Sequence, residues 1–146
     1  ERLHVMPFRH DRLVVFVDKG HLWTQRRSIR LRDVSDQTLI SREAGSTTRA
    51  VFENAMTAEG VTPASVLEMG SREAVREAVA AGMGIGVVSE SEFGHDTRLH
   101  KLIVSDVKLN VTECAICRHD SRENPAVSAF YAVIRELADV AHASAA

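Results

Sequence analysis

The chain has 146 residues, of which 45% are hydrophobic and 26% charged, and 18 basic against 20 acidic side chains give a net charge of −2. These values are typical of a globular protein with a buried core. They exclude a disordered or collagen-like chain and a general electrostatic attraction to nucleic acid or anionic lipid. No apolar run is long enough to cross a bilayer and no secretory leader is recognisable, so we expect a cytoplasmic protein.

The first 37 residues contain one clear strand signal. Residues Leu3–Met6 alternate weakly between apolar and polar side chains, and Pro7 interrupts this pattern. Residues 12–18 are a short apolar run bounded by charges, which predicts a strand buried on both faces. Residues 22–37 hold the densest group of arginines and little periodicity, so we expect a loop with one helical turn near 31–34.

The middle of the chain alternates between strand and helix patterns. Apolar runs predict strands at 38–41, 65–69 and 85–88. Between them, apolar residues recur at helical spacing and a glycine follows each pattern, which predicts helices at 46–59 and 71–81. The order strand, helix, strand, helix, strand with short connections predicts a parallel sheet covered by helices.

The last third of the chain predicts two more strands and a long helix. Ser89–Glu92 matches a capping box, which indicates a short helix. Apolar runs predict strands at 99–104 and 109–118. Asn124–Pro125 is a typical helix start, and apolar residues then recur every three or four positions over 127–141.

The sharpest chemical signal lies where two predicted strands lead into helices. The segment 41–49 crosses a glycine followed by three hydroxyl residues, and Gly70–Arg72 repeats the arrangement. Helix N-termini attract anions, and in a parallel sheet both of these would open on the same edge. The alternative is that one of Ser46 or Thr47 only caps the first of these helices. The candidate anion-binding residues are Ser41, Arg42, Ser46, Thr47, Thr48, Ser71 and Arg72.

Other motifs predict structure rather than chemistry. Gly82–Gly86 follows a helix and precedes a strand, the reverse of a dinucleotide-binding fingerprint, so we expect a helix cap and close packing. Cys114 and Cys117 fall in a predicted strand and are expected to be buried or half-buried structural thiols. The seven histidines lack metal-ligand spacing, and neither paired carboxylates nor a nucleophile elbow is recognisable. We therefore expect no metal, no cofactor and no catalytic residue.

Three segments carry family motifs. Leu39–Glu53 reads LISREAGSTTRAVFE and contains the pattern R-E-x-G-S-x-T-R. Glu68–Ser89 reads EMGSREAVREAVAAGMGIGVVS. Leu13–Trp23 reads LVVFVDKGHLW, with Leu22 where the usual motif has proline. In this order the three segments resemble the effector-binding domain of LysR-type transcriptional regulators, and the resemblance extends over residues 12–136.

The resemblance implies an α/β fold of the type II periplasmic-binding-protein kind, with two lobes of parallel or mixed sheets. Residues 1–30 would then form part of the first lobe and a crossover, and residues 31–92 the second lobe. Residues 93–146 would form the return crossover and the C-terminal part of the first lobe. The rest of the first lobe and the helix-turn-helix DNA reader of such regulators are expected to lie outside this sequence.

The resemblance also implies sensing rather than catalysis. Such domains bind a small effector between their lobes, pass the signal to the DNA-binding part, and pair as homodimers. We expect a small anionic effector (an oxyanion, phosphonate or carboxylate), DNA contact only through the N-terminal reader, and no membrane partner. One alternative is a solute-binding protein of a transporter, which needs an export signal. The other is a small α/β enzyme, which needs a histidine or aspartate beside Ser46 or Ser71.

Overall fold

The computed structural model describes residues 2–144, with side chains described through residue 138. The chain divides into two compact units. The larger unit is Arg12–Val111, and the smaller unit joins Glu1–Asp11 to Thr112–Ala146. The lobe boundaries expected from the family resemblance follow a different division of the chain and stay a prediction.

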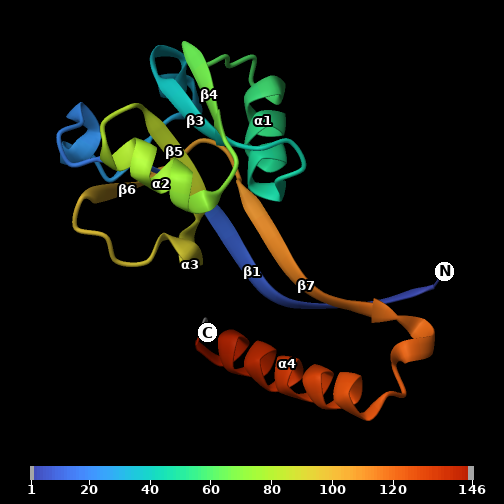
Figure 1. The fold of residues 1–146 in the computed structure, drawn as a ribbon. Helices are drawn as coiled ribbons and strands as arrows, with labels where there is room; N and C mark the ends of the chain where they lie inside the picture. The colour runs from blue at the N-terminus through green and yellow to red at the C-terminus, as the bar shows by residue number, and fades with distance from the viewer. Residues whose placement is uncertain (1, 145–146) are drawn as a thin grey trace. The chain divides into compact units, whose positions relative to one another are not determined.

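The elements alternate along most of the chain (Figure 1). The strands are β1 (Leu3–Asp18), β2 (Ser28–Ile29), β3 (Thr38–Arg42), β4 (Ser65–Met69), β5 (Ile85–Ser89), β6 (Leu99–Val104) and β7 (Asn110–Arg118). The α-helices are α1 (Thr47–Ala58), α2 (Arg72–Ala80), α3 (Glu90–Phe93) and α4 (Pro125–Ser144). Three 3₁₀ helices are η1 (Leu22–Gln25), η2 (Leu31–Asp36) and η3 (His119–Ser121).

The larger unit is built on a mixed sheet with the order β2-β6-β1-β5-β3-β4. Strand β3 pairs in parallel with both β4 and β5, so the parallel arrangement predicted for residues 38–88 is confirmed. Strand β1 runs antiparallel to β5 and β6. Because β3 and β4 are parallel, the helices that follow them begin at the same edge of the sheet.

Two hydrophobic clusters cover the two faces of this sheet. Residues Leu13–Val17 of β1 are all buried, as the apolar run predicts, and they alternate between the clusters. Helix α1 contributes Phe52 and Met56 to one cluster, and α2 contributes Val75, Ala78 and Val79 to the other. The two helices therefore cover opposite faces of the sheet (Figure 1).

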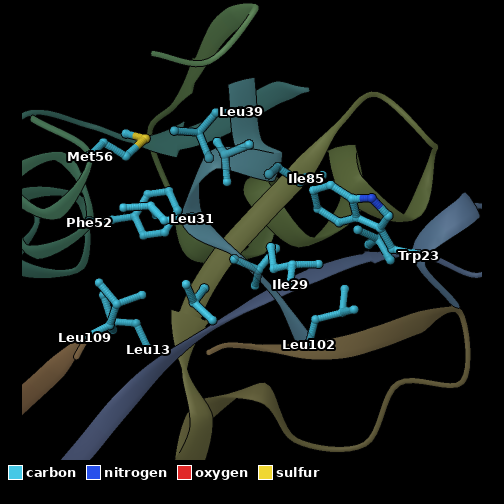
Figure 2. Packing of buried hydrophobic residues seen from close by; sticks show 14 residues of the cluster. Leu13, Trp23, Ile29, Leu31, Leu39, Phe52, Met56, Ile85, Leu102 and Leu109 are labelled. Atoms are coloured by element: carbon cyan, nitrogen blue, oxygen red, sulfur yellow. The ribbon is translucent and has the colours of Figure 1, made fainter. Parts of the chain in front are cut away.

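The larger of the two clusters joins α1 to β1, β3, β5 and the segment before β3. Phe52 is 2% exposed and belongs to the same cluster as Leu31 and Leu39 (Figure 2). The same cluster contains Trp23 and Leu102 at its other end. Burying a large aromatic side chain of this kind contributes on the order of 2 to 3 kcal/mol, so Phe52 is the main attachment of α1.

Gly84, just before β5, and Gly86, within it, allow neighbouring atoms to pack closely against the backbone. A Cβ on Gly84 would lie 2.3 Å from the carbonyl oxygen of Thr38, and a Cβ on Gly86 would lie 2.5 Å from the ring of Phe16. Gly82 has a φ of +75° just after α2, the left-handed conformation of a helix end. The cap and the close packing predicted for Gly82–Gly86 are thus confirmed.

In the smaller unit, the start of β1 pairs with β7 and packs on α4. Tyr131 and Ile134 are buried with Ala115 of β7, and the Tyr131 hydroxyl donates to the carbonyl oxygen of His4 at 3.2 Å. Helix α4 begins at Pro125 as predicted, and the Asn124 side chain accepts from the N–H of Ala126.

Only part of the apolar pattern of α4 is buried. Phe130 and Leu137 are 56% and 55% exposed, whereas Ile134 is 7% exposed. The side chain of Ala141, the last residue of the pattern, lies outside the described residues. Cys114 and Cys117 are unpaired in β7, and they are half-buried as expected.

Three local expectations are wrong. Pro7 does not interrupt the chain, because β1 runs through it from Leu3 to Asp18, and a proline is tolerated in a strand where no ladder hydrogen bond needs its missing N–H. Ser89 makes no side-chain cap for α3, because it is a buried residue of β5 paired with Leu13. The segment 22–37 forms η1 and β2 in addition to the predicted helical turn, which is η2.

Candidate functional site

The two turns at the C-terminal ends of β3 and β4 both carry a serine helix cap. The Ser46 Oγ accepts from the N–H of Arg49 at 3.5 Å, and the Ser71 Oγ accepts from the N–H of Ala74 at 3.1 Å. The Ser71 bond is well formed, and the Ser46 bond is at the limit of a hydrogen bond. Both serines therefore act as caps, and neither lines the hollows described next.

Two adjoining hollows open beside these turns, and they share Arg42, Thr48 and Val87. The first is a small hollow partly open to solvent, and its lining is Phe16, Arg42, Thr48, Arg72, Val75, Arg76, Val87 and Val88. The second is lined by Leu39, Ile40, Ser41, Arg42, Thr48, Arg49, Phe52, Glu53 and Val87. The paired hollows thus have an apolar floor with hydroxyl and guanidinium groups around it.

Two hydroxyl groups in these hollows are available to a ligand. Ser41 is 6% exposed at the end of β3 and lines the second hollow, and Thr48 lies in the first turn of α1 and lines both. Within residues 2–138, neither hydroxyl has a hydrogen-bond partner. A nearly buried hydroxyl is normally hydrogen-bonded, so Ser41 is the less expected of the two.

Arg42 is held by its neighbour in sequence. Its Nε and Nη2 donate to the two carboxylate oxygens of Glu43, each at 2.7 Å. These hydrogen bonds from Arg42 are the main reason that the pKa of Glu43 falls to about 2, and the pKa of Arg42 is raised by the same pair. Both groups are therefore fully ionised at neutral pH, and the pair carries no net charge.

The arginines of α2 have carboxylate partners as well. Arg72 lies 3.0 Å from Glu92, and Arg76 lies 3.8 Å from Asp96. The Arg76 guanidinium also donates to the carbonyl oxygens of Glu92 and Phe93, which ties α2 to the end of α3. The site is thus a set of alternating charges rather than an isolated cluster of cations.

Arg49 is held by three acceptors. Its Nη1 donates to the carbonyl oxygen of Arg42 at 2.9 Å and to Glu68 at 2.6 Å, and its Nε donates to Glu53 at 2.8 Å. These bonds connect α1 to the ends of β3 and β4. Arg49 therefore has mainly a structural function at the edge of the second hollow.

The structure brings together four of the seven residues expected from the sequence. Ser41, Arg42, Thr48 and Arg72 line the hollows, Ser46 and Ser71 cap the helices, and Thr47 is exposed and lines neither hollow. The sequence reasoning missed Arg76. The available signal was its position four residues after Arg72, since residues four apart lie on the same face of a helix.

Among residues 2–144, no helix is both long enough and apolar enough to span a membrane. In the same part of the chain, no group of three or more histidine, cysteine, aspartate or glutamate side chains is placed to hold a metal ion.

The family model described as the LysR substrate binding domain matches residues 1–139. The chain belongs to this family. Among curated relatives, the HTH-type transcriptional regulator CbbR of Rhodospirillum rubrum is 36% identical over 96 residues, which cover 66% of this chain and 32% of CbbR. The RuBisCO operon transcriptional regulator of Acidithiobacillus ferrooxidans is 37% identical over 101 residues, covering 69% and 33%. This LysR-family chain thus spans about a third of the length of these relatives.

Solved structures agree with the family assignment. The regulatory domain of CcmR from Synechocystis PCC6803, in complex with 2-PG, is 27% identical with a TM-score of 0.75, and the match covers 93% of this chain and 67% of that one. The effector binding domain of QuiR, in complex with shikimate, has a TM-score of 0.78 at 20% identity, covering 93% and 63%. The fold is therefore the periplasmic-binding-protein-like α/β fold of LysR effector-binding domains, as predicted.

Proposed function

We propose that this chain is the effector-sensing part of a LysR-type transcriptional regulator and that it has no catalytic activity. The relatives it matches are regulators of transcription, and two similar domains are described in complex with small molecules. In such a protein the chain senses a small anion and a separate helix-turn-helix segment contacts DNA. The proposal includes a cytoplasmic location and a homodimer.

The observation that carries the proposal is the pair of hollows at the common edge of β3 and β4. Arg42, Ser41 and Thr48 meet there above an apolar floor, and two of the three carry hydroxyls with no partner among the described residues. The N-terminus of α1 adds free N–H groups and partial positive charge. This combination suits a small oxyanion, phosphonate or carboxylate.

The proposal is tested by titrating sulfate and inorganic phosphate into the full-length protein by calorimetry, with thermal melts alongside. The variant Thr47→Ala/Thr48→Ala is expected to weaken binding while leaving the melting temperature nearly unchanged. Ser46→Ala is the matched control, because its hydroxyl caps α1 and does not line a hollow. Unchanged affinity together with a lowered melting temperature in the double variant would assign these threonines to helix stability alone.

Self-association and DNA binding need their own measurements. Light scattering of the full-length protein at increasing concentration is expected to give a dimer. A DNA fragment from upstream of its own coding region is expected to shift in a gel, with an affinity that changes when the effector is added. A monomer at high concentration would contradict the dimer without affecting the anion site.

A further inference from the structure

The cation shared by the two hollows is partly buried. Arg42 is the last residue of β3 and is in register with Met69 of β4. Its side chain is 22% exposed and lines both hollows. An anion bound in either hollow would therefore lie near the Arg42 guanidinium.

Glu43, whose carboxylate holds Arg42, lies in an exposed turn. Glu43 follows the end of β3 and stands in a turn that the N–H of Ser46 closes by donating to the Glu43 carbonyl oxygen at 3.2 Å. The turn contains Gly45 in the left-handed conformation, with a φ of +94° and no atom near its missing Cβ. The Glu43 side chain is 39% exposed and belongs to no buried cluster. It can thus leave Arg42 for solvent at little cost in packing.

Glu43 also presents to Arg42 the geometry that a ligand would use. Its two oxygens accept from Nε and Nη2, the paired arrangement by which arginine binds carboxylates and phosphates. A bound oxyanion and the Glu43 carboxylate cannot occupy these two donors at once. The unpartnered hydroxyls of Ser41 and Thr48 beside Arg42 are acceptor and donor groups that Glu43 leaves unused.

We propose that Glu43 is an internal counter-ion that occupies the anion position on Arg42, so that an effector binds by exchanging its own oxyanion for the Glu43 carboxylate. This inference rests on the proposed function and makes Glu43 a specificity-determining residue of that site. A simple carboxylate gains from Arg42 no more than Glu43 gives up. An oxyanion with three or more acceptor oxygens has acceptors for Arg42 and for the hydroxyls of Ser41 and Thr48, which line the same hollow, so the exchange favours tetrahedral oxyanions such as phosphates, sulfate and phosphonates.

The inference is tested with inorganic phosphate as the probe, by calorimetric titration of the full-length protein. Glu43→Gln is expected to bind phosphate about tenfold more tightly than the wild type, the lower range of what a charge-assisted pair contributes. Glu59→Gln is the matched control, because it removes one exposed negative charge at the end of α1, away from Arg42. Its affinity is expected to equal that of the wild type.

A second variant separates occupation of Arg42 from simple charge repulsion. Glu43→Asp keeps the charge but shortens the side chain, so the paired bonds to Arg42 are lost. It is expected to bind phosphate more tightly than the wild type. An affinity equal to the wild type in both Glu43 variants, with phosphate still bound, overturns the internal counter-ion and leaves the proposed function standing. Failure of the wild type and both variants to bind any oxyanion overturns the proposed anion site as well.

Discussion

The turns β3–α1 and β4–α2 are built from similar residues but stand at different places in the sheet. Strand β3 lies between β4 and β5, and its residues Leu39–Ser41 are buried. Strand β4 is at the edge, and four of its five residues are exposed. The turn after β3 therefore has neighbours on both sides and lies beside the hollows, whereas the turn after β4 lines neither of them and its helix contributes Arg72, Val75 and Arg76. We infer that a Gly-Ser turn before a helix lies beside a hollow when the strand that leads into it is central in the sheet.

The largest expected effect is on the free energy of unfolding, and it distinguishes the packing over the central strand β3 from that of the edge strand β4. Phe52→Ala is expected to lower the free energy of unfolding by about 3 to 5 kcal/mol, because it leaves a cavity between α1 and the sheet. Val66→Ala in β4 is the contrasting variant, since Val66 is 51% exposed. Its cost is expected to be within about 0.5 kcal/mol. Urea unfolding measures both, and similar losses would contradict the difference drawn between central and edge strands.

The next effect concerns the arginine of each turn. Arg42→Gln is expected to weaken phosphate binding by about 1.5 to 3 kcal/mol, because a charge-assisted hydrogen bond to a half-buried group is lost. Arg72→Gln is expected to cost less, since the Arg72 side chain is 48% exposed and its charge is screened by solvent. Calorimetry with both variants ranks them, and a larger loss at Arg72 would place the ligand nearer the edge strand.

The caps differ in the same direction as their hydrogen bonds. Ser71→Ala is expected to lower stability by about 1 kcal/mol, because its Oγ makes a good bond to the N–H of Ala74. Ser46→Ala is expected to cost less, since its bond to the N–H of Arg49 measures 3.5 Å. Thermal melts check this order. Phosphate affinity is expected to stay unchanged in both, and a loss in Ser46→Ala alone would make that serine a ligand.

Acid is expected to act on three ion-paired carboxylates, of which only Glu43 lies in one of the two turns. Hydrogen bonds from arginine lower the pKa of Glu43 and of Asp96 to about 2, and bonds from Arg12 and Lys101 do the same for Glu90. In the unfolded chain these carboxyls bind protons first, near their ordinary values of 4.5 and 3.8. Stability is therefore expected to be constant above about pH 5 and to fall progressively toward pH 2. Urea midpoints measured from pH 7 to pH 3 check this, and no decline would contradict the pairs.

The fold between β3 and β5 was predictable because its signals are local. Helix spacing, glycine stops and short apolar runs place α1, β4 and α2 to within one residue. The elements that were missed depend on partners far along the chain. The two-residue strand β2 exists through its pairing with β6, and the continuation of β1 through Pro7 accompanies its pairing with β7. No periodicity within those segments reports such pairings.

The types of residue at the site could be predicted from the sequence, but not which of them cap helices and which line the hollows. The sequence predicted serines, threonines and arginines in the turns. Ser46 and Ser71 cap their helices, however, and Thr48 is the one among Ser46, Thr47 and Thr48 that lines the hollows. Which of two adjacent charged residues faces a site depends on the turn that follows. The hydrogen-bonded pair of Arg42 and Glu43 therefore could not be predicted from the sequence.

Gly86 leaves room for an aromatic ring that lines the first hollow. The ring of Phe16 lies where a side chain at position 86 would stand, and the same ring is part of the floor of the first hollow. Even a single methyl group at position 86 would displace the Phe16 ring. The first hollow lies beside this ring, so its shape would change as well. The position of this ring beside the hollow therefore depends on the absence of a side chain at position 86. If variants were selected for binding a larger or smaller molecule, we expect substitutions at Gly86 and Phe16 to occur together.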